Sequence, residues 1–279
     1  MKLSVLMSIY DKESPACLRQ CLDSIAAQTR SADEIVLVED GPLGQQLQAT
    51  IAAYRSVLPI VSVPLPSHAG LGAALRAGVY VCQGEYIARM DTDDICVPDR
   101  FEKQISFLES NPKVDVVGAA IAEFEEDFAS PRSLRLLPAA GPSLRRFAKS
   151  RTPMNHVTVV FRKASVVCAG NYESCPGFED YHLWARMLTL GYRLHNMQET
   201  LVYVRCGNGM QGRRGGLAYL RGEIEFQSFL RRMGLLDTAG TLKNILTRGP
   251  IRLMPNAVRS VCYSLFLRTP PTAVPRVLR

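Results

Sequence analysis

The sequence has no pattern that would place it among disulfide-rich, zinc-binding or membrane-spanning proteins. Its eight cysteines are scattered and form no Cys-x-x-Cys pair, so we expect small core side chains in a reducing compartment. It has no run of about 18 apolar residues, which argues against a membrane-spanning helix. The apolar run at residues 3–9 is too short for a signal peptide. These absences predict a cytoplasmic protein.

Two common nucleotide-binding signatures are missing from the glycine-containing segment at residues 63–72. This segment, VPLPSHAGLG, matches neither Gly-x-Gly-x-x-Gly nor Gly-x-x-x-x-Gly-Lys, so a Rossmann dinucleotide site and a P-loop lose support. The chain has only four histidines, and no Ser–His–Asp or Cys–His arrangement can be read from their positions. Catalysis by such a triad therefore loses support as well.

Acidic residues are missing from the C-terminal stretch, where the positive charge is concentrated. No Asp or Glu follows Asp237, whereas seven Lys and Arg residues do, and the net charge of the whole chain is +7. The preceding residues are therefore close to neutral, which argues against a nucleic-acid-binding core. We expect a localised basic surface in the tail.

Short apolar strands alternate with amphipathic helices through the N-terminal third. Strands are predicted at 2–10, 35–38, 60–63 and 85–90, and helices at 15–29, 43–56 and 71–82. Ser14 and Pro15 form a helix start signal. This alternation is typical of an α/β fold with a Rossmann-like, mostly parallel sheet flanked by helices.

The remainder of the chain mixes both kinds of pattern. We predict strands at 157–161 and 200–204, helices at 179–190 and 214–233, and two short helices separated by Gly249-Pro250 and Pro255. No clear linker precedes about residue 210. We therefore expect an α/β domain over residues 1–212 and a helical C-terminal extension with a basic amphipathic tail over residues 213–279.

Polar clusters stand at the ends of three predicted strands. In an open α/β sheet, ligands bind beyond the carboxyl ends of the strands. These clusters are therefore predicted to face one binding site: Ser8-Ile9-Tyr10-Asp11, Glu39-Asp40-Gly41 and Asp91-Thr92-Asp93-Asp94.

The acidic cluster at residues 91–94 is the strongest candidate among them. Neighbouring carboxylates repel one another unless water or a cation lies between them, and their oxygens suit Mg²⁺ or Mn²⁺. The alternative is a solvated turn in which the Asp side chains cap a helix. The position at a strand end favours a metal site, and Asp94 is expected to do no more than cap.

The other two strand ends have both functional and structural interpretations. Asp40 could accept a hydrogen bond from a nucleobase N–H, or could form a turn before Gly41. Ser8 and Tyr10 could line a nucleotide pocket, or could be ordinary strand-end residues.

Further candidates lie in the second half. Glu179 and Asp180 begin a predicted helix, where acidic residues complement the helix dipole but can also act as a general base. His156 could face the same cleft or be a structural histidine. Arg213 and Arg214 lie in a glycine-rich segment that could close over a diphosphate or form a solvated loop.

Taken in order, these segments resemble glycosyltransferase family 2, the inverting enzymes of the GT-A fold. Two segments, FEDYHLWARM (178–187) and VRCGNGMQGRRGG (204–216), are similar to the branch of amylovoran-biosynthesis glycosyltransferases of bacterial exopolysaccharide pathways. The resemblance spans roughly residues 2–260. It rests on SVLMSIY (4–10), DEIVLVEDG (33–41), GEYIARMDTDD (84–94), PDR (98–100) and GFEDYHLW (177–184).

The resemblance implies that the domain over 1–212 is a GT-A catalytic domain that uses a nucleotide-sugar, usually UDP-linked. Asp91 and Asp93 would bind a divalent cation, Mn²⁺ or Mg²⁺, with Asp93 the stronger candidate for direct ligation. Asp91 would also contact the nucleotide-sugar. Asp180 would be the general base for a single displacement with inversion, and Glu179 and His156 would support the site.

The same resemblance assigns the nucleotide-sugar to further residues. Asp40 would contact the base beside Ser8 and Tyr10. Arg213 and Arg214 are predicted from their glycine-rich segment, and not from the resemblance, to bind the phosphates. The segment at 68–76 departs from the family, which usually has Asn at its start and Ala-Arg-Asn near its end. No contact is assigned there.

The implied acceptor is a saccharide or a polyprenyl-linked saccharide, used in exopolysaccharide, capsule or O-antigen synthesis at the inner face of the cytoplasmic membrane. Arg252, Arg259 and Arg268 alternate with apolar residues, so the tail could lie on an anionic membrane or could pack on the catalytic domain.

Two other function classes compete with a glycosyltransferase. A non-catalytic nucleotide-sugar-binding module of the same fold would leave the base position vacant, whereas Asp180 is present. A sugar-nucleotide pyrophosphorylase would need a glycine-rich, basic N-terminal loop, whereas Ser8 is followed by Ile-Tyr-Asp-Lys.

Overall fold

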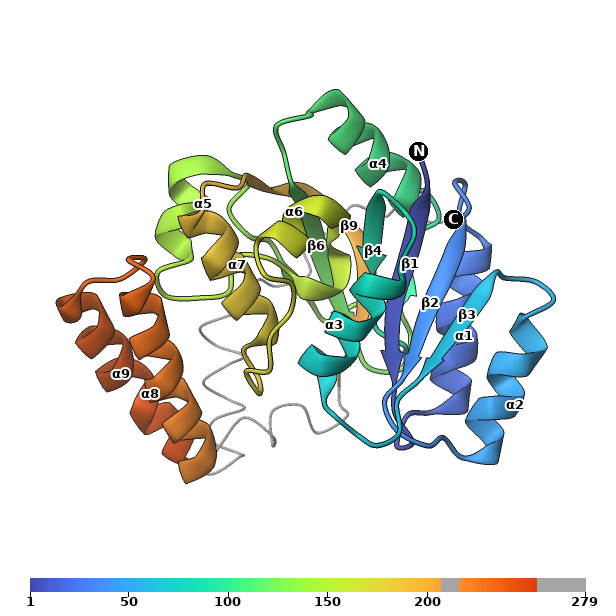
Figure 1. The fold of residues 1–279 in the computed structure, drawn as a ribbon, viewed down its shortest axis with the longest axis horizontal. Coiled ribbons are helices and arrows are strands. Elements are labelled where there is room, and N and C mark those ends of the chain that lie inside the picture. The colour runs from blue at the N-terminus through green and yellow to red at the C-terminus, as the bar shows by residue number, and fades with distance from the viewer. Residues whose placement is uncertain (207–215, 255–279) are drawn as a thin grey trace.

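A nine-stranded sheet runs through the protein and has helices packed against it (Figure 1). The computed structural model describes residues 1–206 and 216–254. Ser14 and Pro15 begin the first helix, as predicted. In chain order the elements are β1 (Leu3–Ile9), α1 (Pro15–Ala26), β2 (Glu34–Glu39), α2 (Gln45–Tyr54), β3 (Ile60–Pro64), α3 (Leu71–Val81), β4 (Tyr86–Arg89), β5 (Ile95–Cys96), α4 (Arg100–Ser110), β6 (Val116–Phe124), β7 (Ser133–Arg135), α5 (Gly141–Phe147), the 3₁₀ helix η1 (His156–Thr158), β8 (Val160–Arg162), α6 (Lys163–Cys168), α7 (Glu179–Thr189), β9 (Leu194–Arg205), α8 (Leu217–Arg232) and α9 (Thr238–Leu253).

The N-terminal part of the sheet is parallel. Strands β3, β2, β1 and β4 lie side by side in that order, and each neighbouring pair is parallel. The chain places β2 and β3 on one side of β1 and β4 on the other. This reversal is the topological switch point at which open α/β sheets bind ligands. The carboxyl ends of β1, β2 and β4 therefore lie at one edge, as the sequence predicts.

The other part of the sheet is mixed. β8 is antiparallel to both β4 and β6, β6 is parallel to β9, and the short β5 is antiparallel to β9 at the edge. β6 is not among the strands predicted from the sequence. It is buried throughout, so its run VVGAAIAEF shows no alternation of apolar and polar residues.

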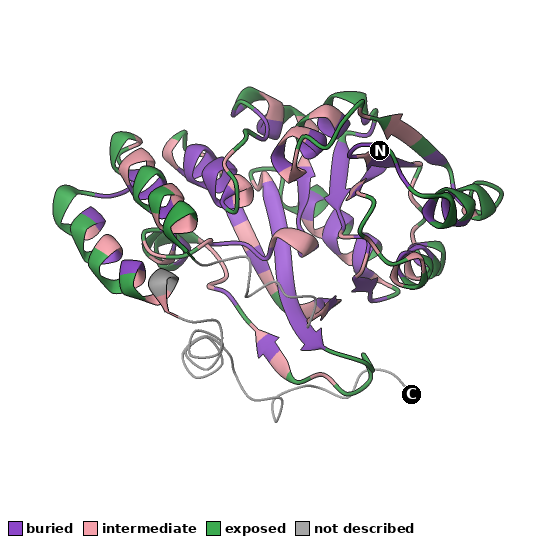
Figure 2. Cartoon of the chain, turned by 90° about the horizontal axis from the view of Figure 1, so that it is seen from below, coloured by how far each residue is buried: buried purple, intermediate pink, exposed green. Residues whose placement is uncertain are grey.

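Two hydrophobic cores fill the space between the sheet and its helices. Alternate residues of β1 belong to different cores, because successive strand side chains point to opposite faces. Val5 and Met7 pack with residues of α1, α2 and α4, whereas Leu6 packs with residues of α3, α5, α6, α7 and α8. Figure 2 shows the buried strands in the middle and the exposed outer faces of the helices around them.

The predicted strand at 157–161 is corrected by the structure. Residues 156–158 form η1, and β8 begins only at Val160. Side chains replace the strand pairing: Thr158 Oγ1 accepts the Ala119 N–H at 2.8 Å, and Asn155 Nδ2 donates to the Ala119 carbonyl at 2.8 Å. Such side-chain bonds offer the backbone an alternative to the sheet ladder.

The helix break expected at Gly249-Pro250 is also corrected, whereas the prediction beyond Pro255 lies outside the described residues. Pro250 lies inside a single helix, α9, which ends at Leu253. Proline in a helix interior costs about 3 kcal/mol, but α9 packs along α8: a Cβ at Gly249 would lie 3.4 Å from Leu220, and Arg248 pairs with Glu223 at 2.8 Å. These contacts favour continuation of the helix.

The predicted basic tail falls largely on residues 255–279, outside the described part of the chain. Within residues 1–206 and 216–254, no helix has both the length and the apolar character needed to cross a bilayer.

Candidate active site

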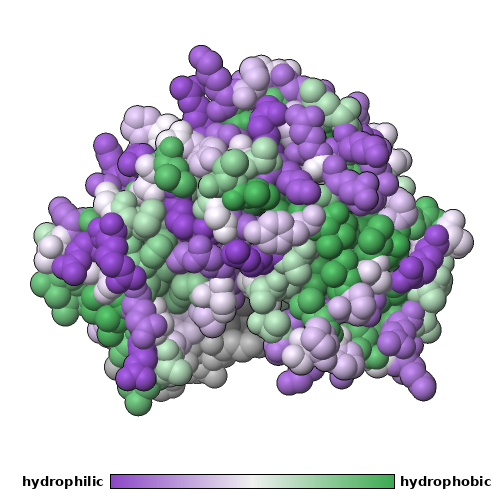
Figure 3. Space-filling view, viewed as in Figure 1, coloured by the Kyte–Doolittle hydropathy of each residue, from purple (hydrophilic) through white to green (hydrophobic). Residues whose placement is uncertain are grey.

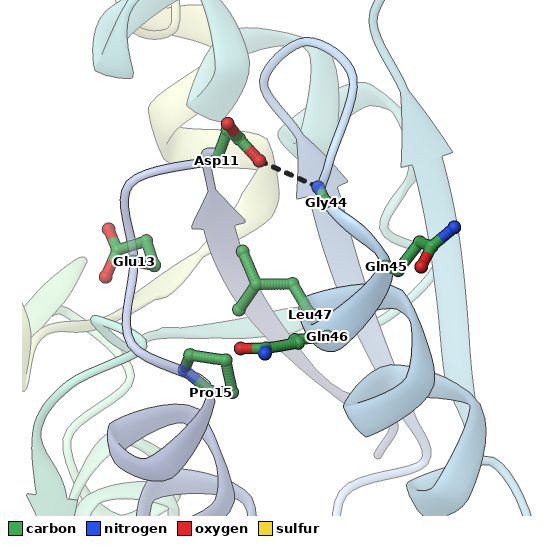
Figure 4. A pocket seen from close by; sticks show the side chains of 7 residues that line it. All are labelled: Asp11, Glu13, Pro15, Gly44, Gln45, Gln46 and Leu47. Carbon is green, nitrogen blue, oxygen red and sulfur yellow. Dashed lines mark hydrogen bonds between the residues drawn. The ribbon is translucent and has the colours of Figure 1, made fainter.

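The end of β1 presents an aromatic ring. Ser8 and Tyr10 are half-buried, and the Tyr10 ring lies 5.8 Å from the His68 ring between centroids, inclined at 33°. Just beyond, Asp11 Oδ1 accepts the Gly44 N–H at 2.7 Å. This contact borders a pocket of about 300 Å³ between the starts of α1 and α2 (Figure 4). The β1 end therefore offers ring faces on which a planar base can stack.

Asp40, at the end of β2, organises the loop that precedes α3. Its side chain is only 4% exposed, and its oxygens accept the Ala69 N–H at 2.6 Å and the Gly70 N–H at 3.1 Å. His68 Nδ1 lies 2.8 Å from the same carboxylate. Asp40 thus holds His68 beside Tyr10, a positioning role that the sequence did not suggest. Its contact with a base stays a prediction.

The acidic group lies in the turn between β4 and β5. One carboxylate oxygen each from Asp91, Asp93 and Asp94 lies within 4.8 Å of the others. Asp94 is buried: its Oδ1 accepts the Arg205 backbone N–H at 2.9 Å, and its Oδ2 has no hydrogen-bond partner among the described residues. The prediction that Asp94 only caps a turn is therefore wrong, because it anchors the end of β9.

This donor set fits a divalent cation. Burial raises the pKa of the Asp94 carboxyl well above its usual value, and the charges of Asp91 and Asp93 raise it further. A hard divalent ion prefers carboxylate oxygens and would relieve the repulsion among them. Asp91 and Asp93 are the half-exposed members, so a ligand from solvent can reach them.

A buried guanidinium contacts one member of the acidic group. Arg89, the last residue of β4, is 2% exposed, and its Nη2 forms an ion pair with Asp91. Burial lowers the pKa of Arg89, but the Asp91 carboxylate more than offsets this, and the net shift is upward. Arg100, also fully buried, donates to the Arg89 carbonyl at 2.8 Å and fixes the strand end.

Tyr172 and His156 form a buried pair whose pKa values register the charge of Arg89. The Tyr172 hydroxyl is 2.9 Å from His156 Nε2, and the His156 ring lies edge-on to Trp184. Burial, and then the Arg89 charge, lower the pKa of His156 well below its usual value, so it stays neutral. Burial raises the pKa of Tyr172; Arg89 opposes this rise, and Asp180 and Asp91 add to it. Tyr172 is therefore within electrostatic reach of both carboxylates.

Asp180 lies in the first turn of α7, as predicted. Its Oδ2 accepts a hydrogen bond from Thr152 Oγ1 at 3.0 Å. Glu179 lies against the start of α3, where a Cβ at Gly72 would come within 2.9 Å of its Cγ. Burial raises the pKa of the Glu179 carboxyl. Asp180 is thus held by a hydroxyl, whereas Glu179 is held by packing and by backbone hydrogen bonds at the helix start.

The C-terminal helices support α7. The Phe226 ring of α8 stacks on Phe178 at 4.6 Å between centroids and contacts Tyr181 at 4.7 Å. The Phe229 ring stacks on His182 at 3.9 Å. These contacts flank Asp180 in the sequence, so α8 packs directly against the helix that presents it.

Sequence reasoning missed three residues of this site. Arg89, Tyr172 and Thr152 were not candidates, although Arg89 lies within the segment that carries the family resemblance. No sequence pattern links Thr152 or Tyr172 to Asp180. Their relation to Asp180 becomes visible only in the folded protein. Arg213 and Arg214 lie outside the described residues.

The fold and the site together define a class of protein. An acidic group at the switch point of a mixed, mostly parallel sheet, with a carboxylate-bearing helix near it, is the arrangement of a sugar-transferring enzyme of the GT-A type. The profile of Glycosyl transferase family 2 matches residues 4–214, and the chain belongs to this family. It is therefore a glycosyltransferase, as the sequence predicts.

Its relatives include enzymes of bacterial polysaccharide synthesis. Amylovoran biosynthesis glycosyltransferase AmsE of Erwinia amylovora is 44% identical over 263 residues, covering 93% of this chain and 97% of that protein. UDP-Gal:alpha-D-GlcNAc-diphosphoundecaprenol beta-1,3-galactosyltransferase of Escherichia coli is 34% identical over 267 residues, covering 96% and 97%.

The fold is shared with a solved transferase. Mannosyltransferase PcManGT from Pyrobaculum calidifontis, in complex with GDP-Man and Mn²⁺, superimposes with a TM-score of 0.64 at 15% identity. The match covers 95% of this chain and 79% of that one.

Proposed function

We propose that the protein transfers a hexose, with inversion, from a UDP-sugar to a polyprenyl-diphosphate-linked saccharide during synthesis of a bacterial surface polysaccharide. The Escherichia coli relative supports this donor and acceptor class, because its name specifies UDP-Gal and a GlcNAc-diphosphoundecaprenol acceptor. The Erwinia amylovora relative supports a role in exopolysaccharide synthesis.

The observation that carries the proposal is the acidic group after β4, where one carboxylate oxygen each from Asp91, Asp93 and Asp94 lies within 4.8 Å of the others. Asp180, which is bonded to Thr152 at the start of α7, supplies a further carboxylate from the second half of the chain. A transferase needs this arrangement, because the departing diphosphate and the attacking hydroxyl lie on opposite sides of one anomeric carbon.

Asp180 is the residue we assign to the acceptor. Its carboxylate takes the proton of the acceptor hydroxyl while that oxygen bonds to the anomeric carbon, and the bond from this carbon to the UDP oxygen breaks. Thr152 orients Asp180 through the 3.0 Å hydrogen bond, and Glu179 supports the start of the helix. An α-linked donor then gives a β-glycoside.

The strand ends are assigned to the donor. Asp91 and Asp93 would hold a divalent cation, Mn²⁺ or Mg²⁺, which would supply positive charge to the diphosphate. Tyr10 and Ser8 would line the base site, and Asp40 would contact the base or position His68 there. The solved mannosyltransferase of this fold, PcManGT, is in complex with Mn²⁺, which supports the choice of cation.

The polyprenyl acceptor places the reaction at the cytoplasmic face of the membrane. The outer faces of α8 and α9 expose apolar side chains, among them Leu217, Leu242 and Leu246, and Figure 3 shows hydrophobic surface at that end of the molecule. Peripheral contact of the basic tail with anionic lipid stays a prediction, as do the phosphate contacts of Arg213 and Arg214.

The test is a transfer assay with the full chain. UDP-galactose, UDP-glucose and UDP-N-acetylglucosamine are each offered with a synthetic GlcNAc-diphospholipid, and the product is followed by mass spectrometry and NMR. We expect one donor to give a β-linked product, with activity lost in EDTA and restored by Mn²⁺. An α-linked product contradicts inversion. Donor binding without product from any acceptor favours the non-catalytic module.

A further inference from the structure

Three arginines in or beside β4 are largely buried, and they differ in how their N–H groups are used. Arg100 donates to Gln104 Oε1 at 3.0 Å and to the Arg89 carbonyl at 2.8 Å, and it also contacts two sulfur atoms. Arg162, on β8, donates to the carbonyls of Val114 and Leu108 and to the Tyr86 hydroxyl. Both side chains therefore serve the fold.

Arg89 is different. Within residues 1–206 and 216–254, its side chain forms one ion pair, with Asp91, and its Nε and Nη1 have no hydrogen-bond partner. A buried donor without a partner is unfavourable, and more so on a charged group. A side chain that served only the fold would be expected to satisfy these groups, as Arg100 and Arg162 do.

The surroundings of Arg89 leave Asp91 as its direct counterion. Tyr172 and His156 are within electrostatic range of Arg89, but Tyr172 is a protonated phenol and His156 a neutral imidazole. Asp94 acts on Arg89 at longer range, and its Oδ1 is engaged by the Arg205 N–H. The guanidinium of Arg89 and an incoming cation therefore compete for the carboxylate of Asp91.

We propose that Arg89 is an internal counterion of the cation site, which competes with the divalent ion for Asp91. This inference rests on the proposed use of Asp91 as a ligand. Because Arg89 is buried, it cannot leave the site, so a cation bound alone must tolerate a neighbouring positive charge. The diphosphate of the donor carries the negative charge that offsets both. Arg89 thus makes cation binding depend on the nucleotide-sugar and disfavours a cation-loaded enzyme without donor.

The test measures Mn²⁺ alone, without nucleotide, from the electron paramagnetic resonance signal of the free ion. Arg89→Met removes the competing charge, and we expect Mn²⁺ to bind at least about tenfold tighter, because charges this close interact by several times the thermal energy. Arg89→Gln, a neutral but polar replacement, should tighten binding in the same direction. Arg89→Lys keeps the charge and should stay close to the wild type.

Arg162→Met is the matched control. It removes a largely buried arginine from a neighbouring strand, with three satisfied hydrogen bonds and no contact with the acidic group. We expect its Mn²⁺ affinity to be unchanged. Circular dichroism and thermal melting establish that each variant is folded. Two neutral replacements are made at Arg89 so that either one, if folded, is sufficient for the test.

Two outcomes separate this proposal from the proposed function. If folded Arg89→Met or Arg89→Gln binds Mn²⁺ no more tightly than the wild type, the counterion role is wrong while the cation site stands. If the wild type binds no Mn²⁺ even with UDP present, the cation site itself is wrong. A wild type whose Mn²⁺ affinity rises with UDP, and rises less in the neutral variants, supports the coupling.

Discussion

The two sides of the active site are built in different ways. The strand-end side comprises the ends of β1, β2 and β4, which are neighbours in a parallel sheet. The helix side comprises the start of α7, where Thr152 bonds to Asp180 and where Phe226 of α8 stacks on Phe178 and contacts Tyr181. The first side is fixed by backbone pairing, and the second by packing between side chains from distant segments.

This difference has a functional consequence. Backbone ladders hold the strand-end side whichever side chains are present, so single substitutions there should change ligand contacts more than geometry. The helix side depends on contacts made by the C-terminal pair α8 and α9. We therefore expect substitutions far from the chemistry to affect turnover through α7, and the following predictions test that contrast.

The largest effect is expected from Asp180→Asn. This variant should bind the nucleotide-sugar normally but lose turnover by roughly two to four powers of ten, the usual scale for loss of a general base. Initial rates and donor titrations measure the two quantities separately. Asp237→Asn is the control, because Asp237 also lies at a helix start, where it caps α9 at 2.7 Å. Full transfer by Asp180→Asn would exclude it as the base.

Phe226→Ala should remove the ring contacts through which α8 supports α7 on the helix side. Removing a buried phenylalanine costs about 3–5 kcal/mol of unfolding free energy, and Phe226 is 1% exposed. Phe101→Ala removes a fully buried ring from the other core and should cost a similar amount. At a temperature where both variants are folded, only Phe226→Ala should lower turnover without weakening donor binding. Equal turnover in the two variants would contradict the role assigned to α8.

Asp40→Asn tests the strand-end side. Hydrogen bonds to charged groups contribute about 1.5–3 kcal/mol, so denaturant unfolding should show a loss of this order. UDP binding should weaken because His68 is no longer held beside Tyr10. Asp33→Asn is the control: Asp33 accepts the Leu3 N–H at 2.7 Å, at the start of β1 and so at the opposite end of the strand. UDP binding that is equal in both variants would remove Asp40 from the donor site.

The smallest effect is a pH dependence of stability that involves His156. Its pKa is lowered in the folded protein, so below about pH 6.5 the unfolded chain binds more protons than the native state. Stability should therefore fall as the pH drops below that value, by at most about 1.4 kcal/mol per pH unit for one histidine. His156→Gln should reduce this slope in urea unfolding at several pH values. His182 and His195, whose pKa values are also lowered, should supply a remaining slope. An unchanged slope in the variant would show that the pKa of His156 is not lowered in the native state.

Much of the N-terminal part could be predicted because its signals are local. Apolar strands, helix start signals and acidic strand ends all lie within short windows, and β1, β2, β3 and β4 follow from them. The mixed part could not be predicted in the same way. β6 is buried on both faces and lacks periodicity, residues 156–158 replace strand pairing with side-chain bonds, and α9 continues through Pro250 because α8 packs against it.

The sequence by itself determined the family, the polar strand ends and the candidate pair of Asp91 and Asp180, because each depends on residue types at short spacing. Only the tertiary structure decided what holds them. It paired Asp91 with the buried guanidinium of Arg89, bonded Thr152 to Asp180 and turned Asp40 toward the loop at 68–70. The contacts of Asp180 and Asp40 join segments that are distant in the chain, and the pair of Arg89 with Asp91 forms because folding buries the guanidinium and leaves it few partners.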